Sequence, residues 1–271
     1  MKTDYECAVI VDDDDDEEYI LPPKIKEIKE KKERKPKTPQ PVLKKYYNEN
    51  EGVFEIGVDE VGRGPLFGRV YTAAVILPKD DSFDSSMVKD SKKFHSKKKI
   101  EEAANYIKQH ALAWYISFED EKVIDKINIL QATQKSMHNS IIEVKKQYNQ
   151  ILKTEGKEEG TDYSYSLLID GNYFNPLTYL NKKTNKLVCM PHVTIEGGDN
   201  KYASIAAASI LAKVERDKYI DDLCNENPTL AEYYSIDSNK GYGAKKHLDG
   251  IKEHGITIWH RRSFGICKSF A

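Results

Sequence analysis

The sequence predicts an α/β protein with a mixed central sheet flanked by helices. Short apolar runs of strand length alternate along the chain with segments whose apolar residues recur at helical spacing. Such alternation is typical of the α/β class, in which helices cover a sheet. At 271 residues the chain is long enough for one large domain or two small ones with a well-buried core.

The first predicted strand covers residues 54–59, where apolar and other side chains alternate with the strand period of two. It ends in two adjacent carboxylates, Asp59 and Glu60, and is followed by Gly62-Arg63-Gly64-Pro65. The glycines let this backbone adopt unusual dihedrals and approach a ligand closely. Two carboxylates beside a glycine-flanked arginine indicate a site that handles phosphate together with a metal.

The remaining elements follow from the same two periodicities. The last helix is rich in alanine, so its small side chains would let it lie close against the sheet. A charged, glycine-bearing loop near residues 156–160 interrupts the preceding helical pattern. Further strands are predicted at 70–77, 113–118, 166–169 and 187–195, and helices at 97–110, 130–151 and 202–223.

Composition separates residues 1–42 from the rest of the chain. The net charge of -2 hides an acidic run at 12–18 and a lysine-dense stretch at 24–37, with too few large apolar residues to fold alone. We therefore expect a disordered, charged N-terminal extension. No stretch has the apolar length to span a bilayer, and no apolar signal region opens the chain, so we expect a soluble cytoplasmic protein with no membrane partner. The four cysteines form no CxxC pair, which argues against a disulfide framework and a structural zinc site.

Three acidic residues, Asp59, Glu60 and Asp170, lie at or just past the ends of predicted strands. If these strands are neighbours, the carboxylates converge and repel one another unless a cation neutralises them. Hard oxygen ligands favour Mg2+ or Mn2+ over Zn2+, and paired metals of this kind support phosphodiester cleavage. A lone strand-end aspartate is more often a loop residue or a helix cap, and the constellation outweighs that alternative.

A fourth acid completes the predicted cluster. Asp199 lies in the sequence GGDN directly before the alanine-rich helix, where an aspartate is most simply an N-cap. A helix N-terminus also favours an ionised carboxylate, so both interpretations can hold together. Asp217 competes for the fourth position but falls well inside the same helix and could pair with a nearby base. We favour Asp199.

Seven motifs, taken in order, resemble those of the ribonuclease HII family over about residues 43–268. The resemblance implies an RNase H-like fold in a catalytic domain at 43–271, with a C-terminal helical extension from about residue 223. The motifs are 59–66 (DEVGRGPL), 90–93 (DSKK), 126–133 (KINILQAT), 170–172 (DGN), 206–217 (AAASILAKVERD), 240–243 (KGYG) and 260–264 (HRRSF).

The resemblance also implies an activity. It implies a monomeric endonuclease that cleaves RNA paired with DNA and single ribonucleotides embedded in duplex DNA. The reaction would depend on Mg2+ or Mn2+ and leave a 3′-hydroxyl and a 5′-phosphate, with a role in removing misincorporated ribonucleotides and RNA primers. A non-catalytic nucleic-acid-binding or scaffolding protein is the second hypothesis, and the intact acids speak against it.

Carried over by position, the resemblance identifies Asp59, Glu60 and Asp170 as metal ligands and Asp199 as the fourth active-site acid. The chain departs from the family pattern at Gly197, where a lysine is usual two residues before that acid. One local charge contact is therefore missing from the expected site.

The resemblance assigns substrate recognition to two further motifs. Gly62, Arg63 and Gly64 match the element that senses the ribose 2′-hydroxyl, the group by which a protein distinguishes RNA from DNA. Tyr242 matches the tyrosine that stacks on the sugar at the RNA–DNA junction; taken alone, it could equally be an exposed turn residue.

Basic residues in the motifs are candidates for phosphate contacts, which position a duplex without reading its sequence. Lys92 and Lys93 are the preferred pair, because they lie in a family motif rather than in a generic lysine run. A solvated charged face is the alternative for the others, and His260 fits a packed residue as well as a substrate contact. The other candidates are Lys245, Lys246, Arg261 and Arg262.

Residues 40–47 (QPVLKKYY) resemble the short peptide by which replication proteins bind a sliding clamp: a glutamine, an aliphatic residue three positions on, then two aromatic residues. The alternative is that Leu43, Tyr46 and Tyr47 form a lead-in helix that packs on the domain. Short motifs match by chance, which favours this alternative.

Overall fold

The computed structural model describes residues 42–50, 52–156, 164–181 and 185–271, which all belong to one compact unit. The predicted N-terminal extension, apart from Val42, lies outside these residues. A five-stranded sheet forms the centre of the unit, in the order β3-β2-β1-β4-β7. Its strands are β1 (Val53–Val61), β2 (Val70–Ile76), β3 (Ala113–Glu119), β4 (Ser164–Asp170) and β7 (His192–Ile195).

The central strand β1 makes the sheet mixed, as predicted. It pairs with β2 in antiparallel orientation and with β4 in parallel orientation, and β7 continues the parallel half. Both faces of the sheet are covered. In β2, Ala74 and Ile76 pack into one core and Ala73 and Val75 into the other, so alternate residues are buried on opposite sides. The chain is therefore a layered α/β structure.

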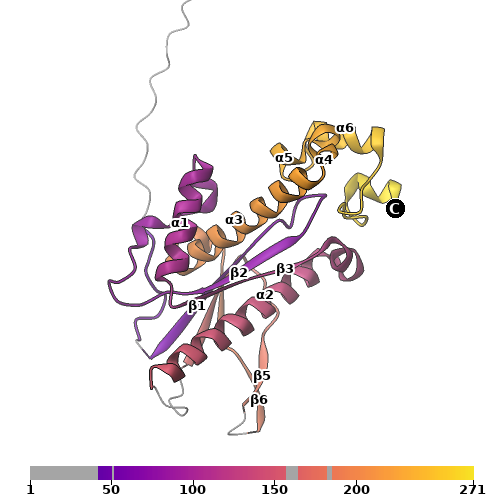
Figure 1. Cartoon of the computed structure of the whole chain (residues 1–271). Helices are drawn as coiled ribbons and strands as arrows, with labels where there is room; N and C mark the ends of the chain where they lie inside the picture. Colours follow the sequence, from indigo (N-terminus) through magenta and orange to yellow (C-terminus); the bar gives the residue numbers. More distant parts are fainter. Residues whose placement is uncertain (1–41, 51, 157–163, 182–184) are drawn as a thin grey trace, which may run out of the picture. The chain divides into compact units, whose positions relative to one another are not determined.

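Two helices cover one face of the sheet and a long helix covers the other (Figure 1). The first face carries α1 (Lys97–His110) and α3 (Ala203–Glu226), and the second carries α2 (Glu121–Thr154). The alanine-rich helix α3 lies close to β1, as predicted. A Cβ atom added at Gly57 would lie 2.2 Å from the backbone carbon of Ser204, so only glycine fits there.

The predicted strand at 187–195 is wrong, because the chain divides there into two strands in different sheets. Residues Lys186–Cys189 form β6, which pairs with β5 (Thr178–Asn181) in a separate two-stranded ribbon, and β7 joins the main sheet. Pro191 separates the two strands. It lacks an N–H group for a sheet ladder, but its carbonyl oxygen accepts a 2.8 Å hydrogen bond from the Leu167 amide.

The helix α2 is longer than the predicted 130–151 and begins at Glu121. Its first turns are separated from the rest by Asn128, whose backbone has φ 65° and ψ 164°. The Asn128 side chain accepts a 3.1 Å hydrogen bond from the amide of Gln131, so it caps the second part of the helix. The kink has a local cause in this residue.

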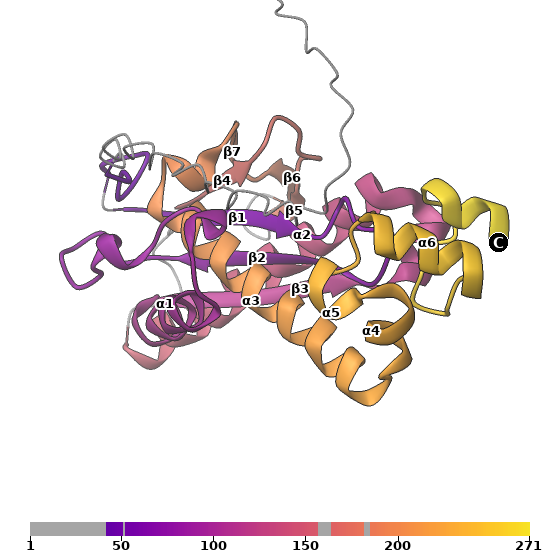
Figure 2. The ribbon, with the colours of Figure 1, turned by 90° about the horizontal axis from the view of Figure 1, so that it is seen from above.

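Short helices beyond α3 form the expected C-terminal extension at one end of the sheet (Figure 2). They are α4 (Thr229–Tyr234), α5 (Ile236–Asn239) and α6 (Lys245–His254). A separate core joins them to Phe67, which is fully buried and follows the Gly62-Arg63-Gly64 segment. Beside this core, the Leu66 amide donates a 2.8 Å hydrogen bond to the carbonyl oxygen of Gly241, so the segment that follows Gly62-Arg63-Gly64 lies next to the distant motif at 240–243.

Candidate active site

The carboxyl ends of the parallel strands bring the predicted acids together. The register of β1 and β4 pairs Val58 with Ile169, so Asp59 and Asp170 follow at the next positions of adjacent strands. The strand β7 pairs with β4 as far as Asp170, and the turn after β7 returns to it: the amide of Gly198 donates a 2.7 Å hydrogen bond to Asp170 Oδ1. The expectation that these strands are neighbours is confirmed.

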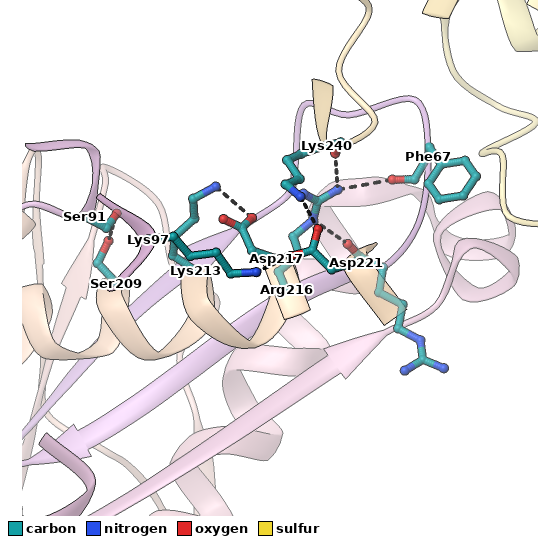
Figure 3. A network of polar contacts seen from close by, with 10 residues as sticks. Phe67, Ser91, Lys97, Ser209, Lys213, Arg216, Asp217, Asp221 and Lys240 are labelled. Carbon is teal, nitrogen blue, oxygen red and sulfur yellow. Dashed lines mark hydrogen bonds and ion pairs between the residues drawn. The ribbon is translucent and has the colours of Figure 1, made fainter. Parts of the chain in front are cut away.

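Asp199 lies in a single 3-10 turn, Gly198–Asn200, between β7 and α3. It is buried, and its Oδ1 accepts a 2.9 Å hydrogen bond from the side chain of Asn200. The N-cap of α3 is Tyr202 rather than Asp199, because the 3-10 turn intervenes, so the simple N-cap interpretation is wrong. Asp217 instead makes a 2.8 Å ion pair with Lys213, as its alternative interpretation predicted (Figure 3).

The acids form a cluster in which Asp59 and Asp199 are buried and Glu60 and Asp170 are partly exposed. Burial raises the pKa of Asp59 well above its usual range, and the charges of Glu60 and Asp170 raise it further. Burial also raises the pKa of Glu60, against which Arg63 acts. Burial, then the charges of Asp90 and Asp170, raise the pKa of Asp199. Such a cluster is stabilised by a bound cation.

The oxygen donors of this cluster suit a hard divalent cation such as Mg2+ or Mn2+. Within the described ranges, no three His, Cys, Asp or Glu side chains lie close enough together to hold a metal ion as they are placed. Glu60 Oε1 lies 3.3 Å from Arg63 Nη1, and Asp59 Oδ1 accepts a 2.6 Å hydrogen bond from the Glu60 amide. A cation would draw Glu60 away from Arg63. The chemistry of the donors fits the group, and the ligand assignment stays a prediction.

Ser209 on α3 is a site residue that the sequence did not reveal. Its hydroxyl is near enough to Asp59 to lower the pKa of that carboxyl against the effect of burial. It also lies 3.1 Å from the hydroxyl of Ser91, directly before Lys92 and Lys93 (Figure 3). A serine in an alanine-rich helix carries no signal for such a role. The sequence predicts only that the alanine-rich helix, which carries Ser209, lies close against the sheet.

Gly62 and Gly64 bring the predicted sugar-sensing backbone next to Tyr242. Gly62 has φ 91°, and a Cβ atom there would lie 2.3 Å from Arg216 Nε, so both conformation and space require glycine. A Cβ atom at Gly64 would lie 3.5 Å from Tyr242 Cε1. The Tyr242 side chain is 47% exposed, so its ring is available beside that backbone.

Arg261 stabilises the backbone of residues 62–68 through hydrogen bonds. It is fully buried, although it was predicted to contact phosphate, and that prediction is wrong. Burial, then the charge of Arg216, lower its pKa to about 9. Turning inward lets a guanidinium satisfy several buried carbonyl groups at once. Its N–H groups donate to the carbonyl oxygens of Gly62 (2.6 Å), Arg63 (3.1 Å), Pro65 (2.8 Å) and Gly68 (2.8 Å).

A second buried arginine, Arg216 of α3, links the same segment to the turn that carries Tyr242. Its Nη2 donates to the carbonyl oxygens of Phe67, at 3.3 Å, and Lys240, at 3.0 Å (Figure 3). Its Nε donates to the carbonyl oxygen of Arg69 at 3.2 Å. The two arginines therefore hold the shape of residues 62–69 through backbone oxygens rather than through carboxylates.

The preferred lysines lie beside Asp199. Lys93 Nζ donates a hydrogen bond to the side chain of Asn200, and the charge of Lys92 lowers the pKa of Asp199. Gly197, where the family usually has a lysine, has φ 60° and no atom within 4 Å of an added Cβ atom. The contact of Lys92 and Lys93 with phosphate stays a prediction.

The other basic candidates divide by exposure. The packed interpretation of His260 is the correct one, since this side chain is 1% exposed. Lys245 and Lys246 in the first turn of α6 are exposed, as is Arg262, and phosphate contacts by these three remain predictions.

Comparisons with known proteins identify the family of the chain. The family model described as Ribonuclease HII matches residues 56–267. The chain belongs to the ribonuclease HII family. It is 41% identical over 219 residues to the ribonuclease HII of Bacteroides thetaiotaomicron, covering 80% of this chain and 92% of that relative. The chain is thus a ribonuclease H, a divalent-metal-dependent hydrolase that cleaves the RNA strand of RNA–DNA hybrids.

Solved structures of this group share the fold. The PCNA:RNase HII complex from Archaeoglobus fulgidus matches with a TM-score of 0.53 and 22% identity, covering 79% of this chain and 96% of that one. The Bst-RNase HIII structure in complex with Mn2+ matches with a TM-score of 0.50 and 15% identity, covering 74% and 70%. No helix in the described ranges is long and apolar enough to cross a membrane.

Proposed function

We propose that this ribonuclease HII cleaves on the 5′ side of ribonucleotides, both in hybrids and at single ribonucleotides embedded in duplex DNA. The proposal is carried by one observation: the Gly62-Arg63-Gly64 backbone and the exposed Tyr242 ring lie together, beside the strand that carries Asp59 and Glu60. A single 2′-hydroxyl read at this place suffices to select the cleavage point. The cellular role would be removal of misincorporated ribonucleotides and RNA primers.

Asp59, Glu60 and Asp170 would hold two Mg2+ or Mn2+ ions, which activate a water and stabilise the leaving oxygen when bound. The water would give up one proton, and its oxygen would form the new bond to phosphorus as the bond to the preceding 3′ oxygen breaks. That oxygen takes a proton and becomes the 3′-hydroxyl, and the ribonucleotide keeps the 5′-phosphate. Asp199 lies beside Asp170 and can hold a proton near these oxygens, since burial raises its pKa.

The role of the acids is tested by Asp170→Asn. This change keeps the oxygen that accepts from Gly198 but removes the charge, so we expect a folded protein whose cleavage rate falls about a thousandfold. Asp217→Asn is the matched control, because Asp217 pairs with Lys213 outside the cluster. Cleavage by Asp170→Asn at the parental rate would contradict the proposal.

The sugar-sensing role is tested by comparing two substrates under each metal. One is a DNA duplex with a single ribonucleotide, and the other is a uniform RNA–DNA hybrid. We expect both to be cut, and Tyr242→Ala to slow cleavage of the single-ribonucleotide duplex more, since only there is the junction unique. Cleavage of the long hybrid alone would remove the junction-sensing roles of Gly62, Gly64 and Tyr242.

Docking on a sliding clamp through residues 40–47 is a narrower proposal, motivated by the motif and by the Archaeoglobus relative solved with PCNA. Gln40 and Pro41 lie outside the described residues. Leu43 packs against the core and the Tyr47 ring lies 5.7 Å from that of Tyr202, without the lead-in helix of the alternative interpretation. Clamp binding would release both side chains. Unchanged pull-down of a purified clamp after Leu43→Ala plus Tyr47→Ala would end this proposal.

A further inference from the structure

Two buried histidines connect the C-terminal segment to the backbone of Tyr242. The amide of Thr257 lies 2.9 Å from His260 Nδ1. His260 Nε2 lies 3.1 Å from His247 Nε2, and His247 Nδ1 lies 2.8 Å from the carbonyl oxygen of Tyr242. These contacts form one chain of hydrogen bonds, called here the histidine relay, from Thr257 to Tyr242.

The ends of the relay fix the position of every proton in it. A backbone amide can only donate, so His260 Nδ1 accepts from Thr257 and the ring proton lies on Nε2. That proton is donated to His247 Nε2, so the proton of His247 lies on Nδ1 and is donated to the Tyr242 carbonyl oxygen. Each imidazole is neutral, and both of its ring nitrogens take part in a hydrogen bond. A second proton on either ring would set two N–H groups against each other.

The surroundings of the relay keep it neutral. His247 and His260 are at most 1% exposed, and aromatic rings pack against them: Phe67 lies 5.1 Å from His260, and Tyr234 of α4 contacts both imidazoles. Burial lowers the pKa of both histidines. Beside burial, the neighbouring His247 also lowers the pKa of His260, which further disfavours a charged ring there. Within the described ranges, no hydrogen bond or ion pair joins either imidazole to a carboxylate.

The relay is one of several contacts that immobilise the turn under Tyr242. The Tyr242 carbonyl oxygen also accepts a 2.8 Å hydrogen bond from the Ala244 amide, so both of its lone pairs are used. On the other side, the carbonyl oxygen of Gly241 accepts from the Leu66 amide at 2.8 Å, and a Cβ atom at Gly241 would lie 2.9 Å from Phe67 Cβ. The Tyr242 ring itself stays exposed above Gly64.

We propose that His247 and His260 are positioning residues for Tyr242, and that the relay holds this turn so that the ring stands beside Gly64 where the ribose is read. The inference rests on the proposed role of Tyr242. It explains why two ionisable side chains are buried as neutral groups beside a substrate-binding turn. Two histidines that only filled space in the core would not need defined tautomers. They would also not need the hydrogen bond from His247 to the Tyr242 carbonyl oxygen.

The proton order can be measured on the unmodified chain. Long-range 15N–1H correlation spectra near neutral pH should show His247 as the Nδ1–H tautomer, the minor form of a free imidazole in water, and His260 as the Nε2–H tautomer. Two Nε2–H rings, or a charged ring, would overturn the relay. This measurement needs no variant, so it holds even if substitutions at the pair prevent folding.

The positioning role is tested by a double-mutant cycle between His247 and Tyr242. His247→Phe keeps a ring but removes both hydrogen bonds, so kcat/KM for a single-ribonucleotide duplex should fall about tenfold. In a Tyr242→Ala background the same change should cost less than about twofold, because the ring to be positioned is gone. Equal losses in both backgrounds would show a general structural effect and overturn the proposal.

Two controls complete this test. His254→Phe changes the last residue of the same helix, whose ring stacks on Tyr233 outside the relay, and should leave kcat/KM and the cycle unchanged. Thr257→Val removes a hydroxyl that lies 2.9 Å from His260 Nδ1 and accepts from the Trp259 amide at 3.3 Å, but it keeps the hydrogen bond from the Thr257 amide. Its loss in kcat/KM and its coupling to Tyr242 should therefore both be smaller than those of His247→Phe. Parental cleavage by Tyr242→Ala would refute the role of Tyr242 in the proposed function, whereas correct tautomers with an additive cycle would refute the positioning role alone.

Discussion

Gly62 is the residue on which the sugar-sensing backbone most directly depends. Gly62→Ala would place a methyl group 2.3 Å from Arg216 Nε at φ 91°, so Arg216 must move and release its carbonyl partners. We expect a loss of about 2–4 kcal/mol in unfolding free energy and at least about a tenfold fall in cleavage of a single-ribonucleotide duplex. Urea unfolding and initial cleavage rates measure the two effects.

The control for this change is Gly156→Ala. Gly156 also has a positive φ, of 71°, but no atom lies within 4 Å of an added Cβ atom. Its substitution should therefore cost only the backbone strain, about 1 kcal/mol, with cleavage unchanged. Similar losses in both variants would mean that the close approach of Arg216 has no special role.

The sequence predicts which acids lie close together more reliably than which basic side chains are exposed. Asp59, Glu60 and Asp170 are predictable because the ends of neighbouring parallel strands must converge. Arg261 is not, because the neighbouring arginines of one motif differ only in burial: Arg261 is fully buried and Arg262 is exposed. Burial depends on the tertiary fold, which a residue type in a motif does not encode.

The first turns of α2 act as an anchor for the C-terminal segment. Asp125 accepts hydrogen bonds from the amides of Arg262 and Ser263, each at 2.9 Å, and from the Ser263 hydroxyl at 2.6 Å. Asp125→Ala leaves these donors to water, so we expect about 1–3 kcal/mol of lost stability and faster amide exchange at 262 and 263. Asp249→Ala, which breaks only an exposed ion pair with Lys252, should cost less than about 1 kcal/mol. Equal losses would contradict the anchor.

The elements themselves are predictable where one periodicity runs unbroken. The helix α1 matches its predicted bounds, 97–110, because its apolar spacing is regular. The segment 187–195 reads as one strand, since sequence periodicity does not show that β6 and β7 pair with different partners. The start of α2 was missed because Asn128, at positive φ, interrupts the helical spacing seven residues after Glu121. In each case the partner or the kink is set by tertiary contacts.

At the scale of the whole molecule, the buried histidines make folding stability depend on pH. Burial and the neighbouring His247 lower the pKa of His260 from 6.5 to about 3. Between these values the unfolded chain binds a proton that the folded chain does not, so the contribution is complete above pH 6.5 and is lost as pH falls towards 3. Below pH 6, the titration of His260 should lower the unfolding free energy of the parental chain by about 1.4 kcal/mol for each unit by which the pH decreases.

Urea unfolding of His260→Phe should show a correspondingly smaller pH slope than the parental chain, whatever its absolute stability. An unchanged slope in His260→Phe would mean that His260 does not stay neutral in the folded protein.

The acidic cluster should make the metal-free protein less stable than it could be. Asp59, Glu60 and Asp199 have raised pKa values, so their ionised forms are disfavoured in the fold and stability decreases as pH rises through those values. Removing one charge by Asp170→Asn should therefore raise the Tm in chelator by a few degrees, about 1 kcal/mol.

Mg2+ at a hundred times its Kd should stabilise the parental chain by about 2.7 kcal/mol, and the Asp170→Asn variant by much less. Asp217→Asn should respond to Mg2+ like the parental chain, because Asp217 is neutralised by Lys213 outside the cluster. If Asp170→Asn were less stable than the parental chain in chelator, the acids would not repel one another. If Mg2+ stabilised both proteins equally, Asp170 would not help to bind the cation, and the metal site on which cleavage is proposed to depend would be refuted.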